Sequence, residues 1–310
     1  MTTRAWLRAL ALLALIGSVH AAELELAVAR GPVSLLVYVA EAKSYFAAEG
    51  VAPHLRDCAS GRACFEQLAQ GQADLATAAE LLVALDSFNK PSDLAIVATL
   101  SASSQQIKLV ARRSAGIEAP AQLQGKRIGS VPGTSAQYFL DTWLLFHEVD
   151  PRQVQFVPLP AEQLAGALQR REVDAVAIWE PHAAKALAAL AGDVAALPGP
   201  RVYTQRFNLV TSRRALARAE RLVAERPAEA AAILKARLQI DTPLAEAALT
   251  EHEHGLRLDA ALLATMDSQT RWALREGHVA AGQRPGNLLR SVEAAPLRHA
   301  VPGAVSLLGP

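Results

Sequence analysis

The spacing Leu-x5-Asp-x5-Glu occurs twice in this chain, at residues 68–80 and again at 168–180. In both copies a helical pattern leads through a turn into a short apolar strand, and the copies end at Glu80 and Glu180. A strand that follows a helix in this way buries its apolar faces inside a layered α/β sheet. The repeat therefore predicts two α/β lobes, each presenting a strand end to something held between them.

Strand and helix patterns alternate along the chain in two sets, which is typical of parallel α/β structure. The first set begins with a strand at 24–29 and a helix at 34–49, and it ends with a strand at 107–112. The second set begins with a strand at 126–131 and ends with one at 207–211. The other expected elements are strands at 52–58, 74–77, 94–100, 154–159 and 173–178 and helices at 62–70, 134–148 and 162–170.

The C-terminal third of the chain has a different pattern. From Arg213 onward it is helical and rich in alanine, with helices expected at 215–225, 227–240 and 260–276 and no further strand. Helices without a sheet of their own must cover an existing one, so we expect this tail to pack back onto the first lobe. The chain would then cross between the lobes near 107–114 and 207–213, and these crossings would form a hinge.

The first residues have the three parts of a secretory signal peptide. Arg4 and Arg8 precede an apolar run from Ala9 to Ile16, and small residues follow up to Ala22. This run is far shorter than the roughly 20 apolar residues that span a bilayer, which argues against a membrane anchor. No cysteine stands at the cleavage point, which disfavours a lipid anchor. We therefore expect export and cleavage near Ala21.

Cleavage would leave a chain of about 290 residues with almost no net charge, long enough for one large or two medium cores. It removes two arginines, so that the 31 basic residues become 29 against 30 acidic ones. A balanced charge does not attract nucleic acid or an anionic membrane surface. Nucleic acid is therefore not an expected partner.

The two cysteines, Cys58 and Cys64, lie close together in the sequence. In an oxidising compartment a pair this close favours a disulfide over two free thiols. The disulfide would hold the turn at Ser60 and Gly61 in one shape. The alternative is two small buried side chains, and the spacing excludes a CxxC redox motif.

Candidate ligand contacts of the second set lie where strands end. Gly133, Thr134 and Ser135 follow an expected strand and open an expected helix, so free backbone N–H groups, the helix dipole and two hydroxyls suit an anion or a polar group. An ordinary N-cap is the alternative. Trp179 offers an apolar wall with one N–H donor, and Glu180 could pair with a cationic group. Alternatively, Trp179 lies buried under the next helix and Glu180 caps that helix.

The first set offers equivalent positions. Ser60 and Gly61 occupy a strand-to-helix turn where glycine lets the backbone approach a ligand and serine offers a hydroxyl. A tight turn held by the cysteines explains them equally. Small or hydroxyl-bearing residues at other strand ends are further candidates, with helix capping or a solvated loop as the alternative, namely Ser34, Thr77, Ala78, Ser101 and Ser103.

The segment Glu251-His252-Glu253-His254 raises the question of a zinc site. On a helix, residues two apart do not share a face, and no third ligand is placed beside them. We therefore expect a solvated helix surface at these residues, and neither a metal nor a cofactor. The other histidines form no catalytic signature with a serine or a cysteine.

Several motifs together resemble the periplasmic solute-binding proteins of ABC importers, in the nitrate, sulfonate and taurine (SsuA/TauA-like) and thiamine-precursor (NMT1/THI5-like) family. They run in the family's order from about residue 24 to 214. They are Tyr-Phe-Ala-Ala-Glu-Gly-Val at 45–51, Ser-Gly at 60–61, Gly-Gln-Ala-Asp-Leu-Ala at 71–76, Leu-Gln-Gly-Lys-Arg-Ile-Gly at 123–129, Gly-Thr-Ser at 133–135, and Val-Asp-Ala-Val through Trp-Glu-Pro at 173–181.

This resemblance implies a two-lobe, type II periplasmic-binding-protein fold, in which a hinge closes the lobes over a small molecule and presents it to an ABC permease. The implied ligand is a small polar or anionic organic solute, such as a sulfonate, nitrate or a pyrimidine-like compound. The protein would be periplasmic, monomeric and not an enzyme. The expected division is a signal peptide at 1–21, lobe 1 at 22–110, lobe 2 at 111–210, and a helical return to lobe 1 at 211–310.

Two rival functions remain open at this point. Enzymes of menaquinone or pyrimidine-precursor biosynthesis have a similar fold. They are intracellular, however, whereas this chain has an export signal and no evident acid–base pair. The protein could also be the ligand-sensing subunit of a membrane receptor. A permease and an ATPase encoded beside it would favour transport.

Overall fold

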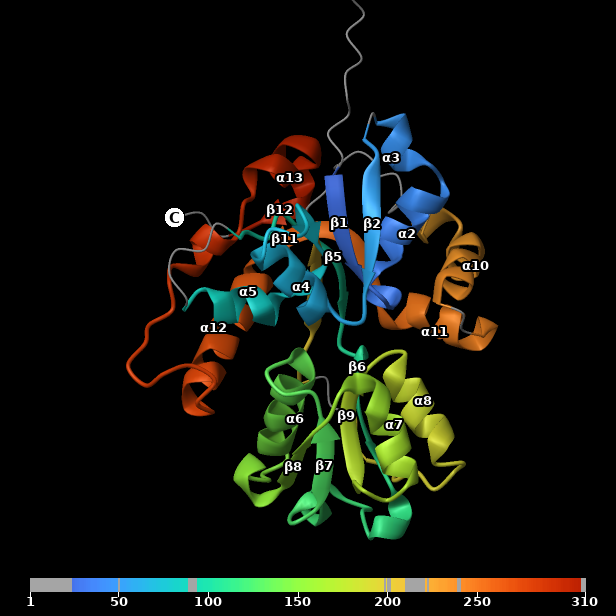
Figure 1. Cartoon of the computed structure of the whole chain (residues 1–310), viewed down its shortest axis with the longest axis vertical. Helices are drawn as coiled ribbons and strands as arrows, with labels where there is room; N and C mark the ends of the chain where they lie inside the picture. Colours follow the sequence, from blue (N-terminus) through green and yellow to red (C-terminus); the bar gives the residue numbers. More distant parts are fainter. Residues whose placement is uncertain are drawn as a thin grey trace, which may run out of the picture.

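The computed structural model describes residues 24–307, apart from residues 50, 89–93, 198, 200–201, 210–220, 222 and 239–240. The chain forms two lobes, drawn one above the other in Figure 1. Lobe 1 contains the N-terminal and C-terminal parts of the chain, and lobe 2 contains its middle. The expected signal peptide and most of the expected helix at 215–225 lie outside the described residues.

Lobe 1 is built on two sheets. A parallel sheet has the strand order β2 (Pro53–Cys58), β1 (Leu24–Ala29) and β3 (Leu75–Ala76). A second, mainly antiparallel sheet has the order β12 (Val305–Ser306), β11 (Glu253–Asp259), β5 (Ala98–Ser103), β10 (Gln205–Leu209) and β4 (Ala78–Ala79). The helices of this lobe are α2 (Leu35–Ala42), α3 (Tyr45–Ala48), α4 (Gly61–Ala69), α5 (Glu80–Asp86), α10 (Pro227–Leu238), α11 (Thr242–Glu251), α12 (Ala260–Arg275) and α13 (Ala295–Ala300).

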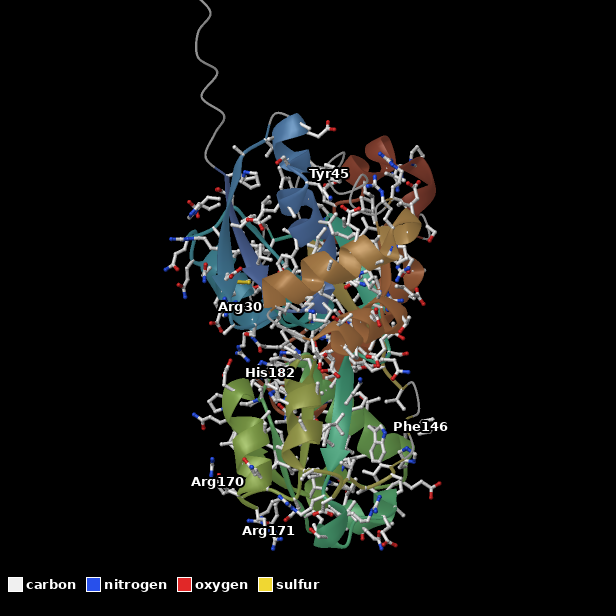
Figure 2. The ribbon with its side chains drawn as sticks, turned by 90° about the vertical axis from the view of Figure 1, so that its right-hand side faces the viewer. Arg30, Tyr45, Phe146, Arg170, Arg171 and His182 are labelled. Atoms are coloured by element: carbon white, nitrogen blue, oxygen red, sulfur yellow. A yellow bond between two sulfur atoms is a disulfide. The ribbon has the colours of Figure 1, made fainter. Side chains whose placement is uncertain are left out.

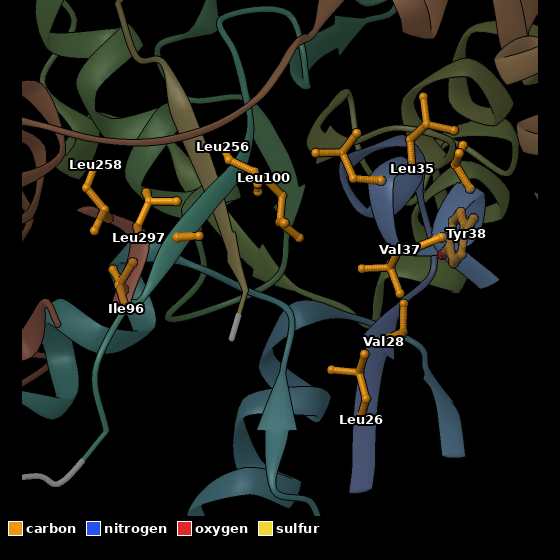
Figure 3. Close-up of a cluster of buried hydrophobic side chains, with 14 of the residues drawn as sticks. Leu26, Val28, Leu35, Val37, Tyr38, Ile96, Leu100, Leu256, Leu258 and Leu297 are labelled. Atoms are coloured by element: carbon orange, nitrogen blue, oxygen red, sulfur yellow. The ribbon is translucent and has the colours of Figure 1, made fainter. Parts of the chain in front are cut away.

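Strand β1 is covered on both faces, because successive side chains of a strand point to opposite sides. Leu26 and Val28 belong to the large core of lobe 1, where they lie with side chains of α2, β5 and β11 (Figure 3). Ala27 and Ala29 point the other way, into a smaller cluster with the two cysteines. Burial of one large aliphatic side chain contributes about 2 kcal/mol, so this core supplies much of the stability of lobe 1.

Lobe 2 has one sheet, with the order β6 (Ile107–Ala111), β9 (Ala175–Trp179), β7 (Arg127–Ser130) and β8 (Gln155–Pro158). The inner strand β9 is parallel to β7 and antiparallel to β6. Alternate β9 side chains enter two cores on opposite faces of the sheet. One core includes residues of α6 (Ser135–Phe146), and the other includes residues of α7 (Ala161–Gln169) and α8 (His182–Ala189).

The repeated spacing corresponds to two equivalent structural units. Asp74 accepts a hydrogen bond from the backbone N–H of Glu25 at 2.8 Å, at the start of β1. Asp174 accepts one from the backbone N–H of Arg127 at 2.9 Å, at the start of β7. In both units the strand after the aspartate then pairs in parallel with the strand whose N–H the aspartate binds. Each aspartate therefore lies at the beginning of a parallel pair of strands, and the two pairs are arranged in the same way.

The chain crosses between the lobes a few residues earlier than we expected. Strand β6 pairs within the sheet of lobe 2, so the first crossing lies at residues 104–106. Strand β10 pairs with β5 and β4 in lobe 1, so the second crossing lies before it, near residues 202–204. Strand pairing decides these positions, and the apolar pattern of a strand does not reveal its partner.

The expectation of a tail without strands is wrong. Strand β11 lies in the tail and joins the antiparallel sheet beside β5, and β12 follows it. Leu256 and Leu258 alternate along β11 and are both buried, which is the period of a strand. The tail helix α12 also reaches lobe 2, where the indole N–H of Trp272 donates to Asp141 at 2.9 Å. No helix among the described residues is long and apolar enough to span a membrane.

Candidate ligand-binding site

A cleft with about 500 Å³ of empty space, part of it open to solvent, lies between the two lobes. In Figure 2, Arg30 lies on the edge of lobe 1 that faces lobe 2, and His182 lies on the facing edge of lobe 2. The lining residues come from both lobes and from the strands next to the crossings. They are Ala29, Arg30, Val33, Ser60, Gly61, Arg62, Ala79, Leu82, Gln106, Thr134, Ser135, Trp179, Gln205 and Phe207.

Two helix N-termini meet at this cleft, one from each lobe. Helix α4 of lobe 1 begins after Ser60, whose hydroxyl oxygen accepts from the N–H of Ala63 at 3.2 Å. Helix α6 of lobe 2 begins after Thr134, whose hydroxyl accepts from the N–H of Ala136 at 3.3 Å and donates to the carbonyl of Val131 at 2.7 Å. Each N-terminus carries a partial positive charge, so both favour an anion placed between them.

Two arginines of lobe 1 add full positive charges to this wall. Arg30 directly follows β1, and its Nε lies 3.4 Å from Asp57 Oδ2. Arg62 is the second residue of α4, and its side chain is 45% exposed. No carboxylate belongs to the lining among the described residues. The lobe 1 side of the cleft is therefore lined by two cationic groups, each of which also faces a carboxylate outside the lining, Asp57 for Arg30 and Glu66 for Arg62.

The remaining walls are mostly apolar. Trp179 ends β9 in lobe 2, while Phe207 lies on β10 and Val33 and Leu82 belong to lobe 1. A Cβ atom at Gly61 would lie 2.9 Å from the Phe207 ring, so glycine lets α4 approach this ring closely. Aromatic walls of this kind favour a ligand that has an apolar or aromatic part.

A buried polar cluster lies beside the second crossing. The Tyr203 hydroxyl is 2.6 Å from Glu80 Oε1 and also hydrogen-bonds with the Ser135 side chain in the cleft. Glu80 further accepts from the backbone N–H of Arg206 at 2.9 Å and from Gln269 at 3.1 Å. Burial raises the pKa of Glu80 to about 7, because the low-dielectric interior disfavours its charged form.

Of the residues predicted as ligand contacts, the structure brings five together in the cleft lining: Ser60, Gly61, Thr134, Ser135 and Trp179. Gly133 lies directly beside them, with φ +64 and its N–H bound to the Gln137 side chain at 2.8 Å. Ala78 is a buried residue of β4 next to the lining residue Ala79.

Four predicted hydroxyl-bearing residues lie outside this lining and bond within lobe 1. The Ser34 hydroxyl donates to the Ala29 carbonyl at 2.8 Å. Thr77 accepts from the N–H of Ala29 at 2.7 Å, and Ser101 donates to the Val33 carbonyl at 3.1 Å. The Ser103 hydroxyl bonds the carbonyl of Glu251. These contacts connect strand ends to the segment between β1 and α2 and to the tail.

Glu180 is buried behind Trp179 and also lies outside the lining. Its Oε1 is 2.9 Å from Lys108 Nζ, and its Oε2 accepts from the N–H of Ala184 in the first turn of α8 at 3.0 Å. Lys108 also contacts Glu251 at 3.0 Å. Burial lowers the pKa of Lys108, but the two carboxylates outweigh this effect and the pKa is raised. Glu180 therefore pairs with a cation of its own lobe and caps a helix.

The expected solvated helix surface at residues 251–254 is wrong, although the Glu253 side chain is exposed. Helix α11 ends at Glu251 and β11 begins at Glu253, so the segment enters a sheet. His252 is buried, with Nε2 2.6 Å from Gln106 Oε1 and Nδ1 2.8 Å from the Ala248 carbonyl. Burial lowers the pKa of His252 to about 4 and that of His254 to about 3. The described residues hold no group of three potential metal ligands.

Our sequence reasoning did not single out Arg30, Arg62, Gln106, Gln205 or Phe207, which all line the cleft. A signal was present for the two arginines, because Arg30 directly follows a strand and Arg62 opens a helix at a predicted ligand turn. Gln106 and Gln205 flank the crossings, whose positions depend on strand pairing. No local pattern marks Phe207 as a cleft residue.

The chain has the periplasmic-binding-protein fold: two α/β lobes meet at a cleft, and helix N-termini and strand ends of both lobes line it. The family model described as "NMT1/THI5 like" matches residues 32–238, which is more than half of the chain. The chain therefore belongs to the NMT1/THI5-like family. No curated protein matches its sequence.

Solved structures share the fold at low sequence identity. The periplasmic aliphatic sulphonate binding protein SsuA from Escherichia coli has a TM-score of 0.71 and 15% identity, over 87% of this chain and 97% of that chain. The alkanesulfonate-binding protein SsuA from Xanthomonas axonopodis pv. citri, bound to MOPS, has a TM-score of 0.71 and 19% identity, over 93% and 99%. The desulfurization enzyme DSZB has a TM-score of 0.63 and 16% identity, over 91% and 99%.

Proposed function

We propose that this chain is an exported solute-binding protein of an ABC importer, which captures a small organic anion of the sulfonate class and delivers it to a membrane permease. One observation carries the proposal: two helix N-termini and two arginines converge on a single cleft whose described lining holds no carboxylate. This arrangement stabilises negative charge that is shared between the lobes. The SsuA proteins of similar fold, named for sulfonates, support the choice of anion.

An anion with an apolar part fits this cleft better than nitrate does. Trp179 and Phe207 offer ring surfaces, and Val33 and Leu82 offer aliphatic ones. A bare inorganic anion would leave these surfaces in contact with water, whereas an aryl or alkyl group would cover them. A neutral pyrimidine would cover the rings but would not use the positive field of the N-termini.

Capture would work by a shift of population between open and closed lobes. A ligand that contacts both lobes favours the closed arrangement by the contacts that it makes only there. We propose that the two crossings, near 104–106 and 202–204, form the hinge, with the chain before the first and after the second crossing in lobe 1 and the chain between them in lobe 2. We further propose a monomer that acts in the periplasm after cleavage near Ala21.

Calorimetric titration of the purified protein tests the ligand class. We expect 1:1 binding of benzenesulfonate, weaker binding of methanesulfonate, and no measurable binding of nitrate or uracil. Trp179→Ala should weaken benzenesulfonate binding more than methanesulfonate binding, because only the aryl ring contacts the indole. Binding of uracil in preference to both sulfonates would overturn the proposal.

Catalysis is the rival use of the same fold, since a desulfurization enzyme shares it and fold alone does not define function. The described cleft lining has no cysteine, histidine or carboxylate to act as nucleophile or base. This composition supports binding over catalysis. Release of benzene with sulfate, or of phenol with sulfite, by hydrolysis of benzenesulfonate during prolonged incubation would contradict it.

A further inference from the structure

Arg62 of lobe 1 bonds directly to lobe 2. Its Nη1 donates to the carbonyl oxygens of Pro132 at 3.1 Å and Gly133 at 3.3 Å. Those two residues form the turn that joins β7 to α6 in lobe 2. Arg62 also lines the cleft, so its side chain crosses the opening between the two lobes.

The facing turn leaves room for this guanidinium. A Cβ atom at Gly133 would lie 2.8 Å from Arg62 Nη1, so any larger residue would displace the arginine. The φ of Gly133 is +64, a conformation that residues with a side chain rarely adopt. The Gln137 side chain accepts the Gly133 N–H at 2.8 Å and thereby holds the turn in place.

The arginine is also oriented from its own lobe. Its Nε donates to Glu66 Oε1 at 3.1 Å, one turn further along α4. This bond directs Nη1 away from the helix and toward lobe 2. A guanidinium has donors fixed in one plane, so holding Nε sets the direction of the others.

Exposure places this contact at the open edge of the cleft. The Arg62 side chain is 45% exposed, whereas Gln106 and Gln205, beside the crossings, are buried at 3% and 6%. The lobes are already joined by the chain at the crossings and, beside α12, by the Trp272–Asp141 and Tyr138–Ser268 hydrogen bonds. A side-chain bond at the exposed edge therefore limits how far they can separate.

Arg30 provides a built-in comparison. It lines the same wall of the cleft, but its Nε faces Asp57 on the neighbouring strand of its own lobe. Its side chain is 64% exposed. Arg30 thus supplies positive charge to the cleft without joining the lobes through any bond found in the described part of the chain.

We propose that Arg62 is a latch, which holds the lobes together across the open edge of the cleft through the carbonyls of Pro132 and Gly133. The latch favours the closed arrangement even without ligand, and it slows the release of a bound one. Only the statement on ligand release rests on the function proposed above. The statement on closure concerns the ligand-free protein alone.

Small-angle X-ray scattering of the ligand-free protein tests closure directly. Arg62→Met keeps the apolar stem and removes the donors, so we expect a larger radius of gyration than in the wild type. Arg62→Lys keeps one charged donor and should give an intermediate value. The matched control Arg30→Met should leave the radius unchanged. An unchanged radius in Arg62→Met, with thermal unfolding like that of the wild type, would overturn the latch.

Stopped-flow kinetics with benzenesulfonate tests the effect on release. We expect Arg62→Met to raise the dissociation rate constant about tenfold, because it removes the charge-assisted hydrogen bonds that one guanidinium makes to lobe 2 at a partly exposed site. Arg30→Met should mainly lower the association rate constant, because it removes a steering charge. Equal changes in both variants would contradict the latch. If no sulfonate binds, the scattering result still decides the question of closure.

Discussion

Glu80 and Glu180 end the two copies of the same spacing, yet the two carboxyl groups have different partners. Glu80 is fully buried, and its hydrogen-bond partners within the described part of the chain are uncharged: the Tyr203 hydroxyl, a backbone N–H and the amide of Gln269. Glu180 is also buried, but it lies 2.9 Å from the ammonium group of Lys108. Their backbone positions agree, while their electrostatic surroundings do not.

The difference shows which contacts the two copies share. In both copies the aspartate makes the same hydrogen bond to the backbone of the strand that pairs in parallel with the strand after it. The partners of the glutamates come from distant segments, such as Tyr203 and Gln269 for Glu80. A local spacing therefore conserves the backbone unit but not the ionisation of its last residue.

The largest expected effect is on the pH dependence of stability. The pKa of Glu80 in the folded protein is about 7, above the ordinary value of 4.5, so this contribution to stability is complete below about 4.5 and is lost as pH rises through 7. Glu80→Gln should remove this pH-dependent part of the free energy of unfolding, which amounts to about 3 kcal/mol between pH 4.5 and pH 8. Urea unfolding at a series of pH values measures the difference.

Asp141 contributes with the same sign, because burial raises its pKa to about 6. The pH dependence in Glu80→Gln should therefore become smaller rather than vanish. The control Glu180→Gln removes the charge paired with Lys108 and should lower stability at pH 5 and at pH 8 alike. Parallel pH profiles for the wild type and Glu80→Gln would refute the difference between the two glutamates.

A second prediction contrasts the two cleft turns. The turn of lobe 1 is closed by the Cys58–Cys64 disulfide, and the turn of lobe 2 has no such bond. Reduction should lower the free energy of unfolding by about 2 kcal/mol, the value for so short a loop in the chain-entropy model. The variant with both cysteines replaced by alanine should not respond to a reducing agent. Labelling of thiols in the denatured, unreduced wild type would disprove the bond.

The smallest expected effect is a difference in stability between variants of the two aspartates, Asp174 and Asp74. Asp174 bonds the Arg127 side chain, at 2.8 Å and 3.2 Å, as well as its N–H, whereas the residue that Asp74 bonds at the equivalent position is Glu25, which carries no positive charge. Asp174→Asn should therefore lower stability by about 1 kcal/mol at pH 7, and Asp74→Asn by less than half of that. Similar losses of stability in both variants would show that the Arg127 side chain does not contribute to stability through Asp174.

This aspartate effect also has a defined pH dependence. Burial raises the pKa of Asp174, but the bonds and charge of Arg127 outweigh it and the pKa is lowered. The stabilisation is thus present above the ordinary pKa of an aspartate and is lost as pH falls through the lowered value. The stability difference between the wild type and Asp174→Asn should shrink in the same range.

The alternation of apolar runs and helical patterns was enough to predict most of the α/β elements. Strand β1 lies at the predicted residues, α12 starts as predicted and ends one residue earlier, and α6 starts one residue later and ends two residues earlier than predicted. Strand β11 was missed because alanine-rich helices surround it, although Leu256 and Leu258 alternate as in a strand. The crossings lie a few residues before their predicted positions, because tertiary packing determines which strands pair with each other.

The candidate site was less predictable than the fold. The two helix N-termini were found because a strand followed by Ser-Gly or Gly-Thr-Ser shows where the chain turns. The direction of a hydroxyl was not readable, since Ser34 and Ser101 bond carbonyls within lobe 1. The contact of Arg62 with Pro132 joins residues 70 positions apart, and only the folded chain brings them together.

A crystal structure of the protein with bound benzenesulfonate tests the central claim most directly. We predict that the sulfonate lies between the N-termini of α4 and α6, within hydrogen-bond distance of groups from both lobes. The phenyl ring should contact Trp179 and Phe207. A ligand that contacts one lobe only, or that binds outside this cleft, would contradict the account.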